Sequence, residues 1–282
     1  MEDLKKAKNI FDSLVEQLIP VVGKEEASPM AFILMEDLLH ISRIQVLSNQ
    51  TVEADLSSLE TPLQKILKGI PLQYALGQAH FYGRDFAVNP NVLIPRPETE
   101  ELVHKILPYL RPNSNLLDIG TGSGCIPITL YLEGPQPNTF AIDISTAAIT
   151  TASQNATKLQ AKVTFIHKDI LAEELDELPP LDIIVSNPPY VTEAEKEQML
   201  DNVLKHEPHL ALFVPNHTPL LFYERIAELA IKQLRTGGML FFEINEQFGK
   251  ETKEMLEQKG FQEVGIHKDM QGKDRICVAI KP

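Results

Sequence analysis

Residues 117–124 read LDIGTGSG, an apolar run that passes directly into three glycines spaced two residues apart. The next residues, CIPITLYL at 125–132, are predicted to form a helix, so the glycines occupy a strand-to-helix turn. Glycine has no Cβ atom and lets a ligand approach the backbone, while the first turn of a helix offers unpaired N–H donors. The pattern therefore predicts a ligand-binding turn at the carboxyl end of a buried strand.

Short apolar runs alternate with helical stretches from Asn115 to the C-terminus. This alternation is typical of a mostly parallel sheet covered by helices on both faces, so we expect an α/β, Rossmann-like fold. Two last strands, separated by a short turn, predict that the sheet ends in an antiparallel hairpin. The predicted strands are NLLDI (115–119), FAIDIS (140–145), VTFIHKDI (163–170), DIIVSNPPY (182–190), GMLFFEIN (238–245), FQEVGIHKD (261–269) and DRICVAIK (274–281).

The N-terminal part of the chain has a different pattern. Apolar residues recur every three or four positions up to Leu18, which predicts an amphipathic helix that stops near Pro20 and Gly23. A second helix is predicted to start after Ser28-Pro29, and shorter ones near residues 44–48 and 62–68. The expected organisation is a small all-helical domain at 1–72 that recognises the substrate, a β-hairpin linker at 73–95 and the α/β domain at 96–282.

Composition excludes several classes of protein. The chain has 282 residues, enough for about two domains, and its net charge of −13 argues against a chain-wide phosphate-binding surface. The apolar runs are far shorter than the ~20 residues of a membrane helix, and the N-terminus lacks a signal-peptide pattern, so we expect a cytoplasmic protein without membrane contact. Cys125 and Cys277 are expected to be reduced and buried. The stretch 206–209, HEPH, is interpreted as a structured polar loop, and no metal site is expected.

Asp143 closes the strand that follows the glycine turn, 19 residues after Gly124. A carboxylate at this place can accept both hydroxyls of a ribose, which predicts a nucleoside-containing cofactor. The dinucleotide pattern has its last glycine one position later, where this chain has Cys125, so a single nucleoside is favoured over a pyrophosphate. For the glycine run taken alone, a turn without a ligand is the alternative.

A second motif, Asn187-Pro188-Pro189-Tyr190, follows the buried strand IIVS. Ligands of open α/β sheets bind beyond the carboxyl ends of the strands, so this motif is expected to face the same crevice as the glycine turn. The prolines fix the backbone and donate no N–H, so the Asn187 side-chain oxygen and a backbone carbonyl can together accept two hydrogen bonds from an –NH₂ group. The alternative is a strand-end turn with Tyr190 in a core.

These motifs resemble those of class I S-adenosylmethionine-dependent methyltransferases that act on nitrogen. More narrowly, the chain resembles the HemK/PrmC family, which methylates the glutamine amide in the Gly-Gly-Gln motif of bacterial peptide chain release factors. The resemblance covers essentially the whole chain and rests on PLQYALGQAHFYGRDFAVNPNVLIPRPETEELV (71–103), DIGTGSGCI (118–126), SNPPYV (186–191), HEP (206–208) with LALF (210–213), and the final Asp274-Arg275 strand.

The resemblance implies a role for each matched residue. Asn187, Pro188 and Tyr190 would be catalytic and, with Pro189, would hold the glutamine amide. Arg96 and Glu98 would help close the pocket. Residues that would bind S-adenosylmethionine are Gly120, Thr121, Gly122, Ser123 and Gly124 at its methionine part and ribose, Asp143 at the ribose hydroxyls, Asp169 and Ile170 beside the adenine, and Asn187. Three positions depart from the family pattern: Asn245, Ile170 and Pro127.

The expected function is transfer of a methyl group from S-adenosylmethionine to a release-factor glutamine, with no direct contact to nucleic acid. A sulfonium is an activated methyl donor, so this chemistry requires mainly positioning. Three alternatives stay open. A nucleic-acid adenine N6-methyltransferase could use the same acceptor pair on an extruded base. A nicotinamide-dependent dehydrogenase is disfavoured by the glycine spacing, and a non-catalytic module would bind the cofactor without turnover.

Overall fold

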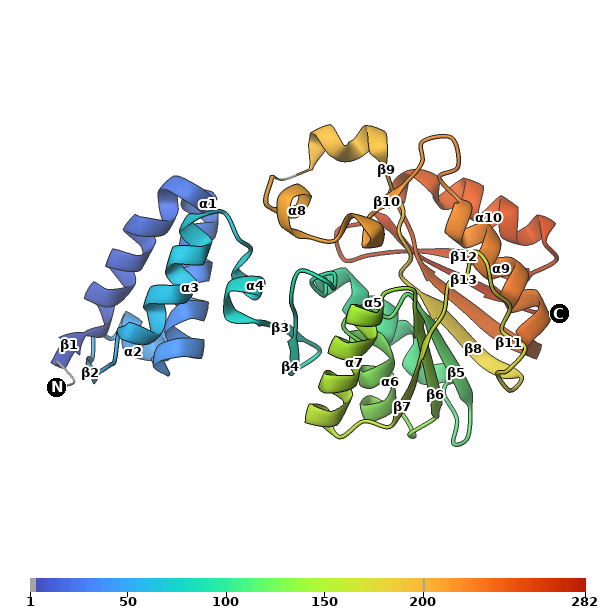
Figure 1. Ribbon diagram of the computed structural model, residues 1–282, viewed down its shortest axis with the longest axis horizontal. Helices are drawn as coiled ribbons and strands as arrows, with labels where there is room; N and C mark the ends of the chain where they lie inside the picture. Colours follow the sequence, from blue (N-terminus) through green and yellow to red (C-terminus); the bar gives the residue numbers. More distant parts are fainter. Residues whose placement is uncertain (1–3, 200) are drawn as a thin grey trace. The chain divides into compact units, whose positions relative to one another are not determined.

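The computed structural model describes residues 4–199 and 201–282, which form two compact units that divide after Gly77. The first unit is helical, and the second holds the sheet (Figure 1). The helical unit contains α1 (Ala7–Leu39), α2 (Arg43–Leu47), α3 (Ser57–Leu67) and α4 (Leu72–Leu76), with β1 (Leu4–Lys6) paired to β2 (Thr51–Glu53) in an antiparallel ladder.

The break in α1 is at Gly23, which has φ 84° and ψ 165° and so interrupts the helical geometry. The predicted break near this residue is confirmed, but the prediction that a new helix starts after Ser28-Pro29 is wrong. The second segment of α1 resumes after Gly23, because Ala27 and Ala31 are both fully buried in the core of this unit and extend the helical packing towards its start. The three-residue strands β1 and β2 are too short to show a sequence period.

The second unit contains one seven-stranded sheet with the order β12-β13-β11-β8-β5-β6-β7. The five strands from β11 to β7 are parallel, β13 runs antiparallel to β11, and β12 and β13 form the predicted C-terminal hairpin. The strands are β5 (Asn115–Ile119), β6 (Asn138–Asp143), β7 (Val163–His167), β8 (Leu181–Ser186), β11 (Leu234–Glu243), β12 (Gln262–Lys268) and β13 (Asp274–Ile280).

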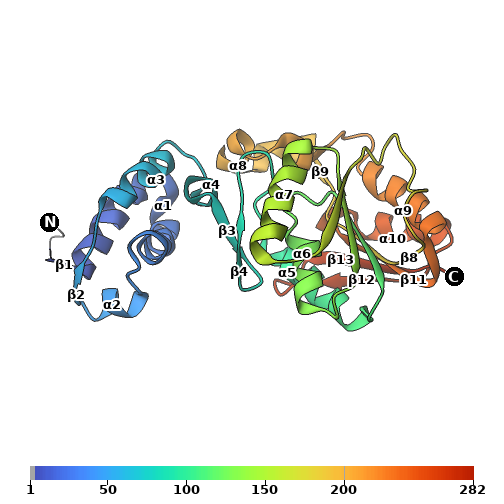
Figure 2. The same ribbon diagram turned by 60° about the horizontal axis from the view of Figure 1, so that its bottom comes forward.

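Helices cover both faces of this sheet, as Figures 1 and 2 show. They are α5 (Pro97–Ile106), α6 (Cys125–Glu133), α7 (Thr146–Leu159), α9 (Leu221–Gln233) and α10 (Gly249–Gln258). Other short elements are β3 (Gln78–Phe81) and β4 (Arg84–Ala87), which form an antiparallel hairpin, and β9 (Val191–Thr192), α8 (Asp201–His206) and β10 (Phe213–Val214).

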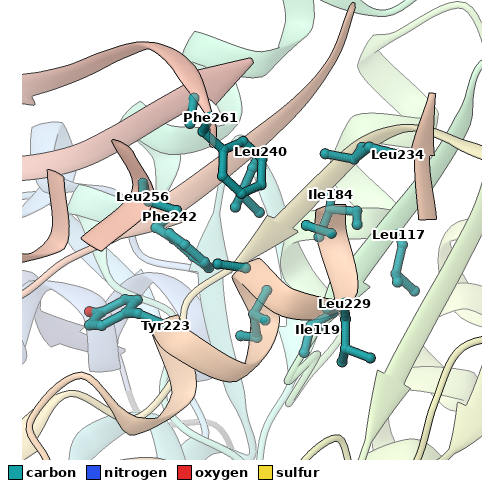
Figure 3. Close-up of a cluster of buried hydrophobic side chains, with 14 of the residues drawn as sticks. Leu117, Ile119, Ile184, Tyr223, Leu229, Leu234, Leu240, Phe242, Leu256 and Phe261 are labelled. Atoms are coloured by element: carbon teal, nitrogen blue, oxygen red, sulfur yellow. The ribbon is translucent and has the colours of Figure 1, made fainter. Parts of the chain in front are cut away.

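Neighbouring residues of the central strands enter opposite cores, as the two-residue period of a strand requires. Leu117 and Ile184 pack in the cluster that includes α9 and α10, which Figure 3 shows, together with Phe242. The adjacent Leu116 and Ile183 belong to the cluster on α5 and α6. Burial of both faces explains why apolar residues occupy adjacent positions in β5 (LL) and β8 (IIV).

The order of the strands locates the site. The chain leaves β5 on one side to form β6 and β7, then returns to the other side of β5 to form β8. At such a reversal the connections after the two neighbouring strands diverge and leave a crevice beyond their carboxyl ends. The glycine turn follows β5 and the Asn-Pro-Pro-Tyr motif follows β8, so both are at this reversal.

Candidate active site

The glycine turn has backbone geometry that needs glycine. Gly120, Gly122 and Gly124 have φ angles of 77°, 54° and 79°, in the left-handed region that side chains with a Cβ atom rarely adopt. The N–H groups of Gly120 and Thr121 donate to the Ile142 carbonyl, at 2.9 and 3.0 Å, and thereby join the turn to β6. The turn is therefore a fixed structure rather than a loose loop.

Gly124 also lies where the first turn of α6 passes close to α7. A Cβ atom added there would be 2.9 Å from Ile128 Cδ1 and 3.1 Å from Ala152 Cβ. We expect Gly124→Ala to lower the free energy of unfolding by about 2–3 kcal/mol, from backbone strain and overpacking together. Urea unfolding checks this against Gly237→Ala, which has a similar φ of 77° but no atom within 4 Å of the added Cβ and should cost only about 1 kcal/mol. Equal losses would contradict the crowding argument.

The Asp143 carboxylate is hydrogen-bonded to the glycine turn. Its Oδ2 accepts the Gly122 N–H at 2.9 Å, and its Oδ1 accepts the Ser145 N–H at 2.8 Å. Burial raises the pKa of this carboxyl, while the two backbone N–H groups oppose that shift by stabilising the carboxylate. Each oxygen keeps a lone pair for a ligand, because a carboxylate oxygen can accept more than one hydrogen bond.

A cavity of about 300 Å³ lies beyond the carboxyl ends of the strands. Its wall includes eight of the predicted residues, namely Gly120, Gly122, Asp143, Asp169, Ile170, Asn187, Pro188 and Pro189. Residues 90–93 and Phe222 also line it. The predicted residues Thr121, Ser123, Gly124 and Tyr190 are outside the wall as far as the described residues define it. The structure thus brings the glycine turn, the acidic strand end and the Asn187 motif to one cavity.

Three buried polar side chains, two in the glycine turn and one at the end of β5, fit a site that receives a polar ligand. Both oxygens of Asp118 and the hydroxyls of Thr121 and Ser123 are buried, and they have no hydrogen-bond partner of good geometry in the described part of the chain. Buried polar groups are normally satisfied by protein, water or ligand. Burial raises the pKa of Asp118 to about 7. These groups, together with the three glycines that have no Cβ atoms, are compatible with a bound amino-acid and ribose moiety.

Asn187 and Tyr190 are both linked by hydrogen bonds to the buried carboxylate of Glu243. The link from Asn187 passes through Thr99, and the link from Tyr190 is direct. The Asn187 Nδ2 donates to Thr99 Oγ1 at 3.3 Å, and Thr99 in turn donates to Glu243 Oε2 at 2.7 Å. The Tyr190 hydroxyl donates to Glu243 Oε1 at 3.1 Å, and its partly buried ring packs against the core. Burial raises the pKa of Glu243, and the Thr99 and Tyr190 hydroxyls and Arg275 oppose this.

Asn155 is a site residue that sequence reasoning missed. It is fully buried on α7 and donates to the carbonyls of Ser123, at 2.9 Å, and Ala87, at 3.0 Å. Its side-chain oxygen accepts the Ala87 N–H at 2.7 Å. This one amide ties the glycine turn to the strand that leads into wall residues 90–93. An asparagine in the middle of an apolar helix face was the only signal for it in the sequence.

Glu207 explains the polar loop at 206–209. Its side chain is 1% exposed and accepts from Arg96 Nη2 at 2.6 Å and from the Ile94 N–H at 3.3 Å. His209, in contrast, meets the Leu204 carbonyl through its Nε2. The carboxylate therefore holds the segment that follows wall residues 90–93 against the loop that carries Pro208 and Leu210, which also line the cavity.

We expect Glu207→Ala to lower the free energy of unfolding by about 2 kcal/mol, because it leaves Arg96 and the Ile94 N–H without their buried acceptor. Urea unfolding measures the loss. The matched control is Glu228→Ala, which removes a half-exposed partner of Lys259 and should cost at most about 1 kcal/mol. A loss at Glu207 no larger than at Glu228 would contradict the assignment of Glu207 as a structural anchor.

The three departures from the expected pattern have local explanations. Asn245 donates from its Nδ2 to the Tyr190 carbonyl at 3.2 Å, which fixes the end of the Asn-Pro-Pro-Tyr motif. Pro127 is the third residue of α6, where its missing N–H breaks no helical bond. Ile170 lines the cavity and supplies an apolar surface. Both cysteines are free and buried, and burial raises the pKa of Cys125 to about 12, so neither is an activated thiol.

Two sequence families match parts of the chain. The Methyltransferase small domain matches residues 99–211, and the PrmC N-terminal domain matches residues 15–77. Among curated proteins, the release factor glutamine methyltransferase of Flavobacterium psychrophilum is 43% identical over 95% of this chain and 97% of its own length. That of Bacillus subtilis is 36% identical over 97% of this chain and 98% of its own length.

Solved structures share the fold. A methyltransferase from Pyrococcus furiosus matches with a TM-score of 0.53 at 19% identity, over 77% of this chain and 96% of that one. A 16S rRNA N2 G1207 methyltransferase from T. thermophilus, solved with AdoMet and guanosine, matches with a TM-score of 0.51 at 21% identity, over 73% of this chain and 50% of that one. The expected class I methyltransferase sheet is thereby confirmed. Within the described residues, no helix is long and apolar enough to cross a membrane.

Proposed function

Because the chain belongs to the release factor glutamine methyltransferase family, we propose that its cavity binds S-adenosylmethionine and the glutamine of a bacterial release factor. The chain is an enzyme that methylates the N5 side-chain amide of this glutamine, in the Gly-Gly-Gln motif. The observation that carries the site assignment is the meeting of Asn187 and Pro188 with Gly120, Gly122 and Asp143 in one cavity wall.

Different residues around the cavity bind different parts of the cofactor. We assign Asp143 to the ribose hydroxyls, because its carboxylate is already oriented by the Gly122 and Ser145 N–H groups. Asp169 and Ile170 border the adenine, and the turn at 120–124 with the buried polar groups in and beside it holds the methionine part. When bound, S-adenosylmethionine supplies a sulfonium methyl group that needs no further activation.

Asn187 and Pro188 hold the acceptor amide. The nitrogen of an amide is a poor nucleophile, because its lone pair is delocalised into the carbonyl group. Two hydrogen bonds from its N–H groups, to Asn187 Oδ1 and to the Pro188 carbonyl, orient that nitrogen and stabilise the positive charge that develops on it during transfer. Neither acceptor is a strong base, so the extra proton leaves to solvent after the methyl group has arrived. Tyr190 contributes by holding the motif through Glu243.

The release factor is the protein partner in this proposal. The net charge of −13 supports a protein rather than a nucleic acid as the substrate, since affinity for nucleic acid depends mainly on Lys and Arg. We assign recognition of the release factor outside its glutamine to the helical unit, residues 1–77, whose own core is complete without the sheet.

Mass spectrometry tests the proposed function. The chain is incubated with S-adenosylmethionine and a purified bacterial release factor, and the Gly-Gly-Gln peptide is then analysed for a single added methyl group. A release factor in which this glutamine is replaced by alanine is the matched control and should gain none. If calorimetry shows cofactor binding but no release factor is methylated, the proposed substrate is wrong.

A further inference from the structure

A buried hydrogen-bond chain lies behind the side chain that we assign to the acceptor amide. Glu243, at the end of β11, is 1% exposed, and Thr99, in the first turn of α5, is 3% exposed. The Thr99 hydroxyl is 2.7 Å from Glu243 Oε2 and 3.3 Å from Asn187 Nδ2. Three elements that are far apart in the sequence thus meet through one hydroxyl group.

The number of protons available to these hydrogen bonds decides which group donates and which accepts. A threonine hydroxyl has one proton to donate, while an ionised carboxylate only accepts. The Thr99 and Tyr190 hydroxyls and Arg275 favour the ionised form of Glu243 against the effect of burial. With Glu243 ionised, the Thr99 proton is committed to the carboxylate, so Thr99 Oγ1 can only accept from Asn187. A reversed Asn187 amide would place its oxygen against lone pairs of Thr99, with no proton between them. The amide nitrogen therefore faces Thr99.

We infer that Thr99 and Glu243 are positioning residues that lock the Asn187 amide with its oxygen available to the glutamine –NH₂ group. Asn187 lines the cavity, and its Oδ1 accepts no hydrogen bond from the residues that the structure describes. An unlocked amide would present –NH₂ to –NH₂ for part of the time, which is repulsive and unproductive. This inference rests on the proposed function, since it gives Asn187 its task.

Glu243 keeps one hydrogen-bond donor to its carboxylate when the Thr99 hydroxyl is removed. Its Oε1 accepts from the Tyr190 hydroxyl at 3.1 Å, and its backbone carbonyl accepts from the Tyr223 hydroxyl at 3.1 Å. Thr99, in contrast, is the described residue that joins the carboxylate to the Asn187 side chain. Removing its hydroxyl therefore releases the Asn187 amide, while the Tyr190 hydroxyl still holds the carboxylate through Oε1.

The test compares Thr99→Val with Thr99→Ser in the methyl-transfer assay. Valine has nearly the shape of threonine without a hydroxyl, so kcat should fall about 10–100-fold, while KM for S-adenosylmethionine should stay within about twofold. Serine restores the hydroxyl and should keep kcat within about threefold of the wild type. Thr99→Ala, which leaves more room, repeats the test if the valine variant does not fold in urea-unfolding controls.

The outcomes separate the possible roles of Thr99. Loss of kcat in the valine variant with recovery in the serine variant supports a positioning role. A different outcome is that both variants keep the wild-type kcat under conditions in which they are folded, with only the valine variant unfolding at a lower urea concentration. In that case Thr99 is a structural brace and the inference is wrong. If the wild type methylates no release factor, the proposed function fails and the inference falls with it. The wild-type arm therefore distinguishes the two failures.

Discussion

Replacement of Asn187 by alanine is expected to lower kcat for glutamine methylation by about 10²–10³-fold. The variant loses one of the two acceptors that orient the amide and stabilise its developing charge, and interactions of this kind in other active sites have effects of that size. Steady-state kinetics with a release factor and S-adenosylmethionine provide the measurement. KM for the cofactor should change much less than kcat, because the interaction with the glutamine grows as the methyl group is transferred.

Asn91→Ala is the matched control for this variant. Asn91 also lines the cavity and has the same side chain, but it lies on residues 90–93 and not at a strand end. Its replacement should leave kcat within a few-fold of the wild type. A comparable loss in both variants would mean that the cavity wall as a whole, and not the acceptor at Asn187, supports transfer.

Replacement of Asp143 by alanine is expected to weaken binding of S-adenosylmethionine by about 100-fold. The change removes the carboxylate proposed for the ribose and leaves the Gly122 and Ser145 N–H groups without their acceptor, so the glycine turn loses its brace. Hydrogen bonds to a charged group contribute about 1.5–3 kcal/mol, and each tenfold change in Kd corresponds to about 1.4 kcal/mol. Isothermal calorimetry measures the loss of affinity directly.

Two comparisons sharpen this test. In Asp143→Asn, one amide oxygen can accept from only one of the two N–H groups at its present geometry, so affinity should be intermediate. Asp182→Ala removes a carboxylate that accepts the Asn115 N–H at 2.7 Å. Asp182 lies near the start of β8, at the end of the strand opposite to the site. Affinity in that variant should equal the wild-type value. Equal loss at Asp143 and Asp182 would point to general destabilisation of the sheet.

Much of the α/β unit could be predicted because its signals are local. Strand β5 and the glycine turn are adjacent in sequence, and so are β8 and the Asn-Pro-Pro-Tyr motif. The rule that ligands bind beyond the carboxyl ends of strands then placed both motifs in one crevice. The prediction for the helical unit was less complete, because burial of Ala27 and Ala31 extended a helix across a serine and proline that normally mark a helix start.

The parts that sequence reasoning missed depend on distant partners. Asn155 meets Ala87 across 68 residues, Glu207 meets Ile94 across 113, and Thr99 meets Glu243 across 144. No periodicity or spacing encodes such pairs, since each is created by the topology that brings the elements together. The hydrogen bond between the Tyr190 hydroxyl and Glu243 is a further pair of this kind.

The Asn155 amide has a consequence for the motions of the catalytic unit. It bonds to Ser123 in the glycine turn and to both backbone groups of Ala87, so movement of Asn155 away from its place on α7 would release both segments. We therefore expect the cofactor turn and the strand before the cavity wall to open together when Asn155 leaves its place. A ligand that binds only the closed form lowers the population of the open form in both segments at once, in proportion to its occupancy.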